Sequence, residues 1–276
     1  KLNNMPRHYP ESPFQTDRFI CDGKEHIFSP RFAYHGFRYI EIEGLKNPSC
    51  DMVSGVFVHQ AVKPRSRFEC SDEMLGKLFR MGQYATLSNL FYMPTDCPTR
   101  EKLGWMNDAQ ASAEQMLTDF EVERLFEKWL QDIFDAMRED GALPGIVPTA
   151  GWGFHWGNGP VSDGALFELP YRVYLHTGKS DLLIKALPYF RRYLDYLKTQ
   201  EDPADGQLSI GLDDWARPNQ RDGNGTPVKL VNSVLRIKFL RIAALAERLA
   251  GNLEKGMNLY EESLCRTEDY KAQWLN

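Results

Sequence analysis

Thirteen residues, from Asp96 to Asp108, concentrate side chains that could do chemistry. They include three carboxylates, two cations and an indole: Asp96, Glu101, Asp108, Arg100, Lys102 and Trp105. A carboxyl group beside an apolar wall or another carboxylate has a raised pKa and can stay protonated, ready to act as an acid. Carboxylates also accept hydrogen bonds from sugar hydroxyls, and an indole face can pack on a pyranose. The segment is therefore typical of glycoside hydrolysis, in which a carboxylic acid protonates the leaving oxygen.

The alternative interpretation of this segment is a solvated loop with surface ion pairs, because exposed charges usually do nothing specific. Two features argue against it. Pro94, Pro98 and Gly104 stiffen the segment, and Trp105 is costly to leave in water. We therefore expect the charges to be held against an apolar wall.

A second cluster lies in residues 151–160, where glycines frame the aromatic side chains of Trp152, Phe154 and Trp156. Asp163 follows it, and a later loop contains Asp214 and Trp215. Aromatic side chains in glycine-rich loops have no obvious place to be buried. A ligand platform and simple loop packing both remain open for them.

The composition limits the class of protein. The 276 residues have a net charge of −5 and are 42% hydrophobic, which is ordinary for a globular chain and excludes disorder or nucleic-acid binding by bulk charge. No stretch approaches the roughly 18 apolar residues of a membrane span, so we expect no membrane partner. The five cysteines form no Cys-x-x-Cys pair and the six histidines no His-x-x-x-His pair. We accordingly expect no metal site and no cofactor, while the compartment (periplasmic, secreted or cytoplasmic) stays undecided.

The pattern of apolar residues divides the chain. Residues 31–42 and 53–62 are rich in aromatic and β-branched residues, which predicts strands. From Ser71, a plausible N-cap, the period becomes helical. Eight apolar residues between 122 and 137 recur at helical spacing, with Gly141 where a C-cap glycine would stand. Further helices are predicted at 164–177, 181–199, 227–250 and 253–275.

The connections between these helices alternate in length. Residues 177–180 and 251–252 are tight turns, whereas 141–160 and 201–226 are long loops dense in Gly, Pro, Asp and Trp. Hairpins joined in this way place every long loop on one side, as in an α/α toroid with its active site on the long-loop face. An irregular α-solenoid is the alternative, and the lack of a fixed repeat favours the toroid.

The motif from Asp96 to Trp105, with Asp108, resembles the signature of bacterial α-L-rhamnosidases, glycoside hydrolase family 78. Residues 30–39 resemble the last strands of the β-sandwich that precedes the catalytic domain in that family, and residues 68–71 resemble the junction. The resemblance implies a mainly α fold, an incomplete (α/α)6 barrel preceded by a small β-sandwich remnant. Residues 1–69 would be the C-terminal strands of the sandwich, and residues 70–276 the N-terminal part of the barrel.

The resemblance also implies roles for individual residues. Glu101 resembles the general acid of an enzyme that cleaves terminal α-L-rhamnose with inversion. The positions that resemble sugar contacts are Asp96, Arg100, Trp105, Asp108, Asp163, Asp214 and Trp215. Many members have one more residue between the Arg and the Lys of this motif, but Glu101 is the only carboxylate in that slot. Many members also carry Trp where Ser162 stands, so Trp152 or Trp156 would supply that wall, or the subsite differs.

An inverting enzyme needs a second carboxylate as base, and nothing in the chain matches the family's base motif. Glu114 and Glu168 are internal candidates, but both lie in helical patterns that favour a structural role. We therefore expect a fragment with little turnover of its own, whose partner is a rhamnose-containing carbohydrate. A toroid with half its wall would expose apolar helix faces, which favours self-association. A glycosidase of different sugar specificity and a non-catalytic carbohydrate-binding fragment are the alternative functions.

Overall fold

A computed structural model describes residues 15–149, 151–213 and 225–275. Its regular elements are almost all helices. In chain order they are η1 (Cys50–Met52), α1 (Glu73–Ser88), α2 (Met106–Asp119), α3 (Glu123–Ala136), α4 (Pro160–Asp163), α5 (Ala165–Thr177), α6 (Asp181–Lys185), α7 (Leu187–Thr199), α8 (Val228–Leu249) and α9 (Leu253–Trp274).

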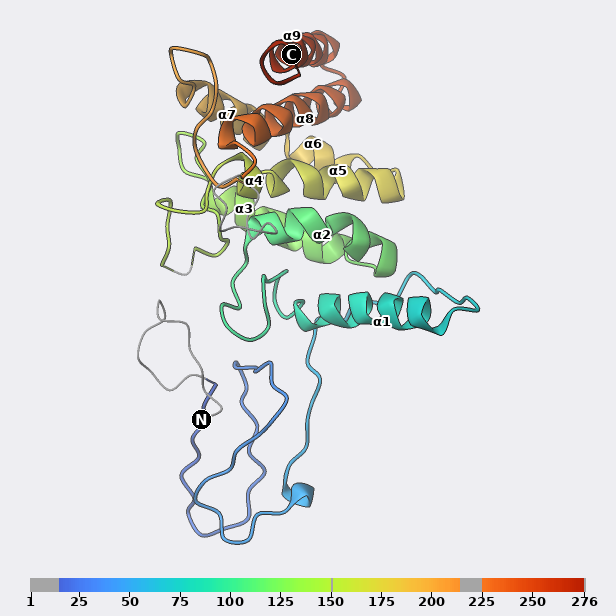
Figure 1. The fold of residues 1–276 in the computed structure, drawn as a ribbon, viewed down its shortest axis with the longest axis vertical. Coiled ribbons are helices and arrows are strands. Elements are labelled where there is room, and N and C mark those ends of the chain that lie inside the picture. Colours follow the sequence, from blue (N-terminus) through green and yellow to red (C-terminus); the bar gives the residue numbers. More distant parts are fainter. Residues whose placement is uncertain (1–14, 150, 214–224, 276) are drawn as a thin grey trace.

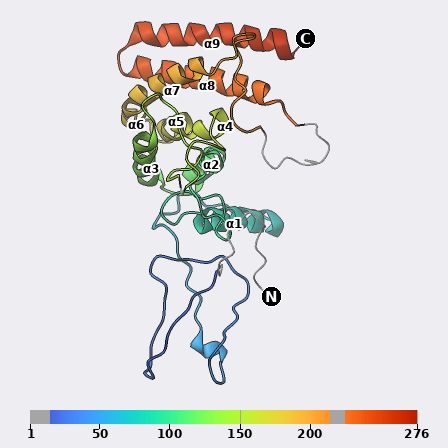
Figure 2. The ribbon, with the colours of Figure 1, turned by 90° about the vertical axis from the view of Figure 1, so that its left-hand side faces the viewer.

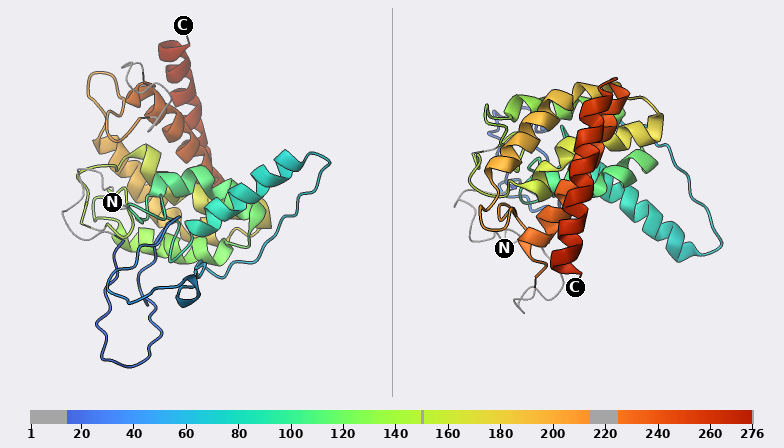
Figure 3. Two further views of the ribbon diagram at one scale, coloured as in Figure 1. Left: turned by 60° about the horizontal axis from the view of Figure 1, so that its bottom comes forward. Right: turned by 90° about the horizontal axis from the view of Figure 1, so that it is seen from above.

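The helices are stacked along the long axis of the molecule roughly in chain order, from α1 near the middle to α9 at the C-terminal end (Figures 1 and 2). Within the described residues, short turns join α2 to α3 and α8 to α9, and α5 is joined to α7 through the short α6. Helix α9 packs along α8, and α2 packs against α5. Seen from above, α9 crosses over the other helices, and α1 projects from one side (Figure 3). The predicted helical hairpin architecture is confirmed.

The apolar stripe of α3 and its two cap residues, Val122 and Met137, build the centre of the core. Its eight residues are all buried, as the spacing predicts: Val122, Leu125, Phe126, Trp129, Leu130, Ile133, Phe134 and Met137. The indole Nε1 of Trp129 donates to the carbonyl oxygen of Val147 at 2.9 Å. This bond satisfies the buried indole N–H and ties α3 to the first long loop.

Aromatic stacking joins the next hairpins. The ring of Phe167 on α5 stacks on Phe190 of α7 and on Phe239 of α8, each with centroids 4.4 Å apart. Arg191 of α7 and the buried Glu247 of α8 form a two-pronged ion pair, with N–O distances of 2.6 and 2.7 Å. The stacked rings therefore join α5 to α7 and to α8, and the ion pair joins α7 to α8, so each of the three helices is fixed to the other two.

The long connections gather at one end of the hairpins. In Figure 1 the described parts of residues 89–105, 137–159 and 200–227 lie on the left, and the short turns after α2, α5 and α8 lie on the right. Two close backbone contacts between these connections support this arrangement. Trp105 pairs with Ile146, and Gly159 approaches Gly211 so closely that a Cβ atom on Gly159 would lie 2.8 Å from the Cα atom of Gly211. The predicted single long-loop face is present.

The expectation of strands is not met: no strand is present among residues 15–69. Apolar side chains of the two predicted segments, such as Phe32, Phe37, Ile40 and Val56, are exposed instead. A strand is stable only when neighbouring strands take up its hydrogen bonds and another layer covers its apolar face. Neither is supplied here by the described part of the chain. The domain division at residues 69 and 70 stays a prediction.

Two predicted helix caps are also corrected. Asp72, not Ser71, caps α1, because its carboxylate accepts from the backbone N–H of Met74 at 2.8 Å. Helix α3 ends at Ala136, several residues before Gly141. Gly141 serves a tight turn instead, where φ is +94° and a Cβ atom would lie 2.3 Å from the Arg192 carbonyl oxygen.

Apolar side chains remain exposed on α1 and α9. On α1 they are Met74, Leu75, Leu78, Met81 and Tyr84, and on α9 they are Leu253, Met257, Tyr260 and Leu264. The C-terminal end of α1 is tied to α2 by the bond from the Thr86 hydroxyl to Gln115 at 2.8 Å, and Phe79 in its middle contacts the ring of Phe68. Self-association through these faces stays a prediction. None of the described helices is both long and apolar enough to cross a membrane.

Candidate active site

The acidic loop before α2 is closed by its own backbone. The Asp96 N–H donates to the Leu103 carbonyl oxygen at 3.1 Å, and the Leu103 N–H donates back to Asp96 Oδ1 at 3.0 Å. The Glu101 N–H donates to the Cys97 sulfur at 3.2 Å. One carboxylate oxygen of Asp96 therefore shapes the loop that presents Glu101.

Lys102 gives this loop a second anchor. Its φ of +56° is unusual for a residue with a side chain, and its ammonium group donates to the Tyr34 carbonyl oxygen at 2.6 Å. This contact joins the acidic loop to the N-terminal segment. The spacing of residues does not predict it, because the two partners are 68 positions apart.

Trp105 joins the acidic loop to the first long loop. Its backbone lies in a short β-like contact, in which Val147 N–H donates to the Gly104 carbonyl oxygen at 2.9 Å and Met106 N–H donates to Gly145 at 3.0 Å. Gly104 is required here, since a Cβ atom would lie 2.2 Å from the Val147 carbonyl oxygen. The indole ring is buried, as expected from the cost of leaving it in water.

The indole Nε1 of Trp105 donates to Glu101 Oε2 at 2.8 Å. This bond orients the carboxyl group that the motif singles out, and Glu101 itself is only partly buried. Asp108 follows in the first turn of α2. Burial, together with the neighbouring carboxylates of Asp96 and Glu101, raises the pKa of the Asp108 carboxyl to about 6. The structure therefore brings the three predicted carboxylates together.

Three tryptophans cover this cluster. The ring centroid of Trp105 lies 5.4 Å from that of Trp156 and 6.1 Å from that of Trp152. The last two are 40% exposed, so they present aromatic surface to solvent beside the acids. Gly157 lets this loop approach Trp105, because a Cβ atom there would lie 2.4 Å from the Trp105 ring. The glycine-framed loop is thus an open aromatic surface as well as a packing element.

Asp163 lies in different surroundings. It is fully buried, and its Oδ2 accepts from the Gly159 N–H at 2.9 Å and from the Tyr193 hydroxyl at 2.8 Å. Burial raises the pKa of the Asp163 carboxyl well above its usual value, although both hydrogen bonds oppose the shift. The structure gives it contacts that hold the aromatic loop to α7, and its role as a sugar contact stays a prediction. The sequence did not predict Tyr193 as the partner of Asp163, because the two residues are 30 positions apart.

The remaining predicted residues are placed as follows. Arg100 is exposed at the rim of the acidic loop. Asp214 and Trp215 lie outside the described residues. The described part of their loop reaches the aromatic loop, since Gly211 lies against Asn158 and Gly159. No group of three His, Cys, Asp or Glu side chains that could hold a metal ion is found in the described ranges.

The two candidate bases, Glu114 and Glu168, both form ion pairs with cationic side chains. Arg172 pairs with Glu114 at 2.8 Å and with Glu168 at 3.2 Å. Glu168 is buried and also pairs with Lys238 of α8. These contacts join α2, α5 and α8, which agrees with the structural role expected of both residues.

A helical hairpin array with an acidic, tryptophan-lined cluster on its long-loop face defines the class of a six-hairpin glycosidase domain. Residues 63–275 match the family profile of the bacterial alpha-L-rhamnosidase six-hairpin glycosidase domain. Residues 4–59 match the profile of the bacterial alpha-L-rhamnosidase concanavalin-like domain. The chain therefore belongs to the bacterial alpha-L-rhamnosidase family.

Curated relatives agree with this assignment. An alpha-L-rhamnosidase of Streptomyces avermitilis is 32% identical over 259 residues, which are 91% of this chain and 24% of that protein. One from Formosa agariphila is 30% identical over 226 residues, 74% of this chain and 22% of that protein. The chain thus spans about a quarter of the length of these relatives.

Solved structures have the same fold. The alpha-L-rhamnosidase from Dictyoglumus thermophilum superposes with a TM-score of 0.71 at 28% identity, over 79% of this chain and 24% of that one. The Streptomyces avermitilis alpha-L-rhamnosidase complexed with L-rhamnose also has a TM-score of 0.71, at 24% identity, over 78% of this chain and 20% of that one. The second comparison concerns the fold alone.

Proposed function

We propose that this chain carries the acid side of an α-L-rhamnosidase active site, with Glu101 as general acid. The observation that carries the proposal is the hydrogen bond from the Trp105 indole to Glu101, beside Asp108 and under two half-exposed tryptophans. Membership of the family supports rhamnose as the sugar. The orientation of the Glu101 carboxyl group supports its role as general acid.

In the proposed reaction, Glu101 gives its proton to the glycosidic oxygen as the bond to the anomeric carbon breaks. A water molecule attacks that carbon from the opposite face and loses its proton to a base, so that the configuration inverts. Asp96 and Asp108 would accept hydrogen bonds from the rhamnose hydroxyls, Arg100 would donate at the rim, and the tryptophans would pack on the ring. Because Glu114 and Glu168 are paired with cations, the proposal takes the base from outside this chain.

Substitution of the acid tests this mechanism in the full-length gene product. Glu101→Gln should lower kcat for alkyl α-L-rhamnosides by at least about 10²-fold, because general acid catalysis contributes on the order of 10²–10⁴. Aryl α-L-rhamnosides with good leaving groups should lose less, since they need less protonation. Glu114→Gln, at an exposed carboxylate that pairs with Arg172, is the matched control and should change kcat less than about 2-fold.

The outcomes separate the alternatives. Unchanged hydrolysis by Glu101→Gln would contradict the acid assignment, and retained configuration in the product, measured by NMR, would contradict inversion. Hydrolysis of another aryl glycoside in preference to the rhamnoside would show that the enzyme is specific for a different sugar. Robust turnover by the 276-residue chain alone would overturn the statement that the base lies outside it.

A further inference from the structure

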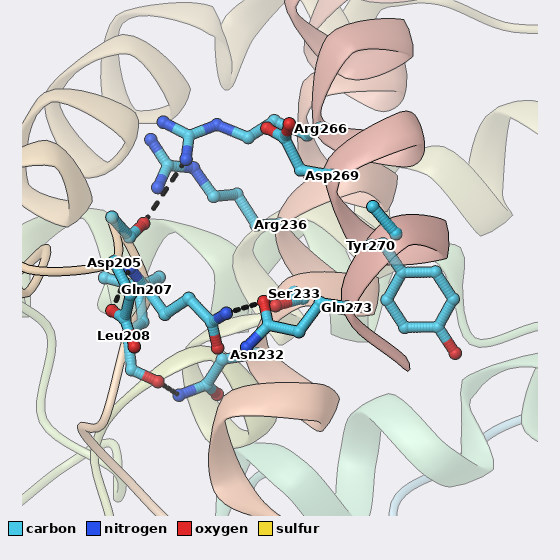
Figure 4. A pocket seen from close by; sticks show the side chains of 12 residues that line it. Asp205, Gln207, Leu208, Asn232, Ser233, Arg236, Arg266, Asp269, Tyr270 and Gln273 are labelled. Atoms are coloured by element: carbon cyan, nitrogen blue, oxygen red, sulfur yellow. Dashed lines mark hydrogen bonds between the residues drawn. The ribbon is translucent and has the colours of Figure 1, made fainter. Parts of the chain in front are cut away.

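Cationic side chains join different parts of this chain. Arg236 and Arg266 line a cavity between the loop after α7, α8 and α9, where Figure 4 shows their guanidinium groups side by side. Both pair with Glu201, and no residue of the acidic loop lines this cavity. Lys102 instead connects the acidic loop to the N-terminal segment, through the Tyr34 carbonyl oxygen. This second connection reaches the residue next to the proposed acid.

Tyr34 contacts the connection that carries Glu101 at two points. The centroid of its ring lies 4.4 Å from that of Phe91, near the start of the connection. The Lys102 ammonium lies 5.1 Å from the same ring and donates to the Tyr34 carbonyl oxygen at 2.6 Å. A cation over an aromatic face and a hydrogen bond from a charged donor are both stronger where water is partly excluded. Tyr34 therefore links the start of the connection to the residue that follows Glu101.

Gly36 gives the N-terminal segment a further contact with the acidic loop. A Cβ atom on Gly36 would lie 2.4 Å from Thr99 Cγ2 and 3.1 Å from the Pro98 carbonyl oxygen. The backbone of Gly36 is not in the left-handed region, so a side chain there would meet only the loop itself. The N-terminal segment thus touches the loop both before Glu101, at Thr99, and after it, at Lys102.

The backbone of Lys102 turns the chain directly after Glu101. Its φ of +56° is unfavourable for a residue with a side chain, and such a conformation persists only where surrounding contacts hold it. On the other side, the Glu101 N–H donates to Cys97 Sγ at 3.2 Å. Because Tyr34 holds the Lys102 ammonium, the N-terminal segment stabilises the turn that presents Glu101 to the Trp105 indole.

We propose that Lys102 is a positioning residue for Glu101, and that residues 34–36 hold the acid in line with the glycosidic oxygen through the acidic loop. The inference rests on the proposed function, because it concerns the placement of the proposed acid. The region that matches the concanavalin-like profile, residues 4–59, then contributes to proton transfer as well as to folding. Asp108 and Trp152 lie on other elements, so sugar binding should depend less on this contact than proton transfer does.

Substitution of Lys102 in the full-length gene product tests the proposal. Lys102→Met removes the ammonium but keeps an unbranched stem, and it should lower kcat for alkyl α-L-rhamnosides at least about 10-fold, because a small misplacement of a reacting group is costly. KM should change less than about 3-fold, and kcat for aryl α-L-rhamnosides with good leaving groups should also fall less than about 3-fold, since these need less protonation. A merely structural role would lower kcat for both substrates alike.

Two further variants control this result. Lys102→Arg can donate to the same carbonyl oxygen and should restore kcat for alkyl rhamnosides to within about 3-fold of the wild type. Lys128→Met removes an exposed lysine that pairs with Asp132 on α3, and it should change kcat less than about 2-fold.

Gly36→Ala tests the same loop from the N-terminal segment. The added methyl group should displace Thr99 and lower kcat for alkyl rhamnosides at least about 5-fold, again with a smaller loss for aryl rhamnosides. Gly55→Ala is the matched control in the same segment, because nothing lies within 4 Å of its Cβ position, and it should change kcat less than about 2-fold. Gly36→Ala also replaces Lys102→Met as the test if circular dichroism shows that variant unfolded.

The outcomes separate this inference from the proposed function. The inference is overturned if both Lys102→Met and Gly36→Ala keep kcat for alkyl rhamnosides within about 2-fold of the wild type, or if each lowers both kinds of kcat by the same factor. It is also overturned if Lys102→Arg is as impaired as Lys102→Met. Unchanged hydrolysis by Glu101→Gln would contradict the proposed function and the inference together, whereas an impaired Glu101→Gln beside two unimpaired positioning variants overturns the inference alone.

Discussion

Asp108 and Asp163 both lie by the long-loop face, and burial raises the pKa of each, but their surroundings differ. Asp108 is half-buried beside two other carboxylates and near exposed tryptophans. Asp163 is closed off, with one oxygen held by two donors from the protein. A raised pKa therefore has different meanings in the two places. At Asp108 the raised pKa occurs beside carboxylates and tryptophans that a ligand could reach. At Asp163 it occurs in a buried contact that holds the aromatic loop to α7.

The largest effect that tests this contrast is expected from Asp163→Ala. The substitution leaves the Gly159 N–H and the Tyr193 hydroxyl without an acceptor in a buried place and should lower the free energy of unfolding by about 3 kcal/mol. Asp108→Ala is the control and should change it by less than about 1 kcal/mol. Urea unfolding followed by circular dichroism measures both, and equal losses would remove the distinction between the two carboxyls.

A smaller effect is expected where the aromatic wall meets the acids. Gly157→Ala adds a Cβ atom 2.4 Å from the Trp105 ring at a φ of +76°, which should lower stability by about 2 kcal/mol and change the tryptophan fluorescence. Gly151→Ala is the matched control, because φ is +89° there but nothing lies within 4 Å. The Gly151→Ala substitution should lower stability by only about 1 kcal/mol, because it strains the backbone at a positive φ without a steric clash. Equal costs and unchanged spectra would show that Gly157 does not position the indole.

The smallest effect concerns pH. The folded pKa of Asp108, about 6, is above the usual 3.8, so its contribution to stability is complete below about pH 4 and is lost as the pH rises through 6. The shift corresponds to roughly 2 kcal/mol between pH 4 and pH 7, and screening by solvent around this partly exposed carboxyl reduces it. Over this interval the wild type should therefore lose about 1 kcal/mol more than Asp108→Asn, as urea unfolding at each pH would measure. Asp140→Asn should not change this interval, because Arg138 lowers the pKa of the exposed Asp140 to about 2. A wild-type profile parallel to that of Asp108→Asn would contradict the raised pKa.

The helices were predictable because their information is local. The α3 stripe and the glycine-punctuated turns at Gly178 and Gly251 follow from spacing within one or two turns of chain. The strands expected before residue 62 were wrong for the described residues, since β structure depends on partners elsewhere. The acidic motif was also predictable, because its carboxylates and Trp105 lie within thirteen consecutive residues.

The sequence by itself determined the hairpin plan, the long-loop face and the set of acids and tryptophans that the family motif contains. The tertiary structure decided which carboxyl is open and which is closed, because that depends on the 30-residue reach from Asp163 to Tyr193 and on the close approach of Gly157 to Trp105. It also decided that Tyr34 and Gly36 lie against the loop that carries Glu101. Burial and hydrogen-bond completion are properties of neighbours in space, and spacing along the chain does not contain them.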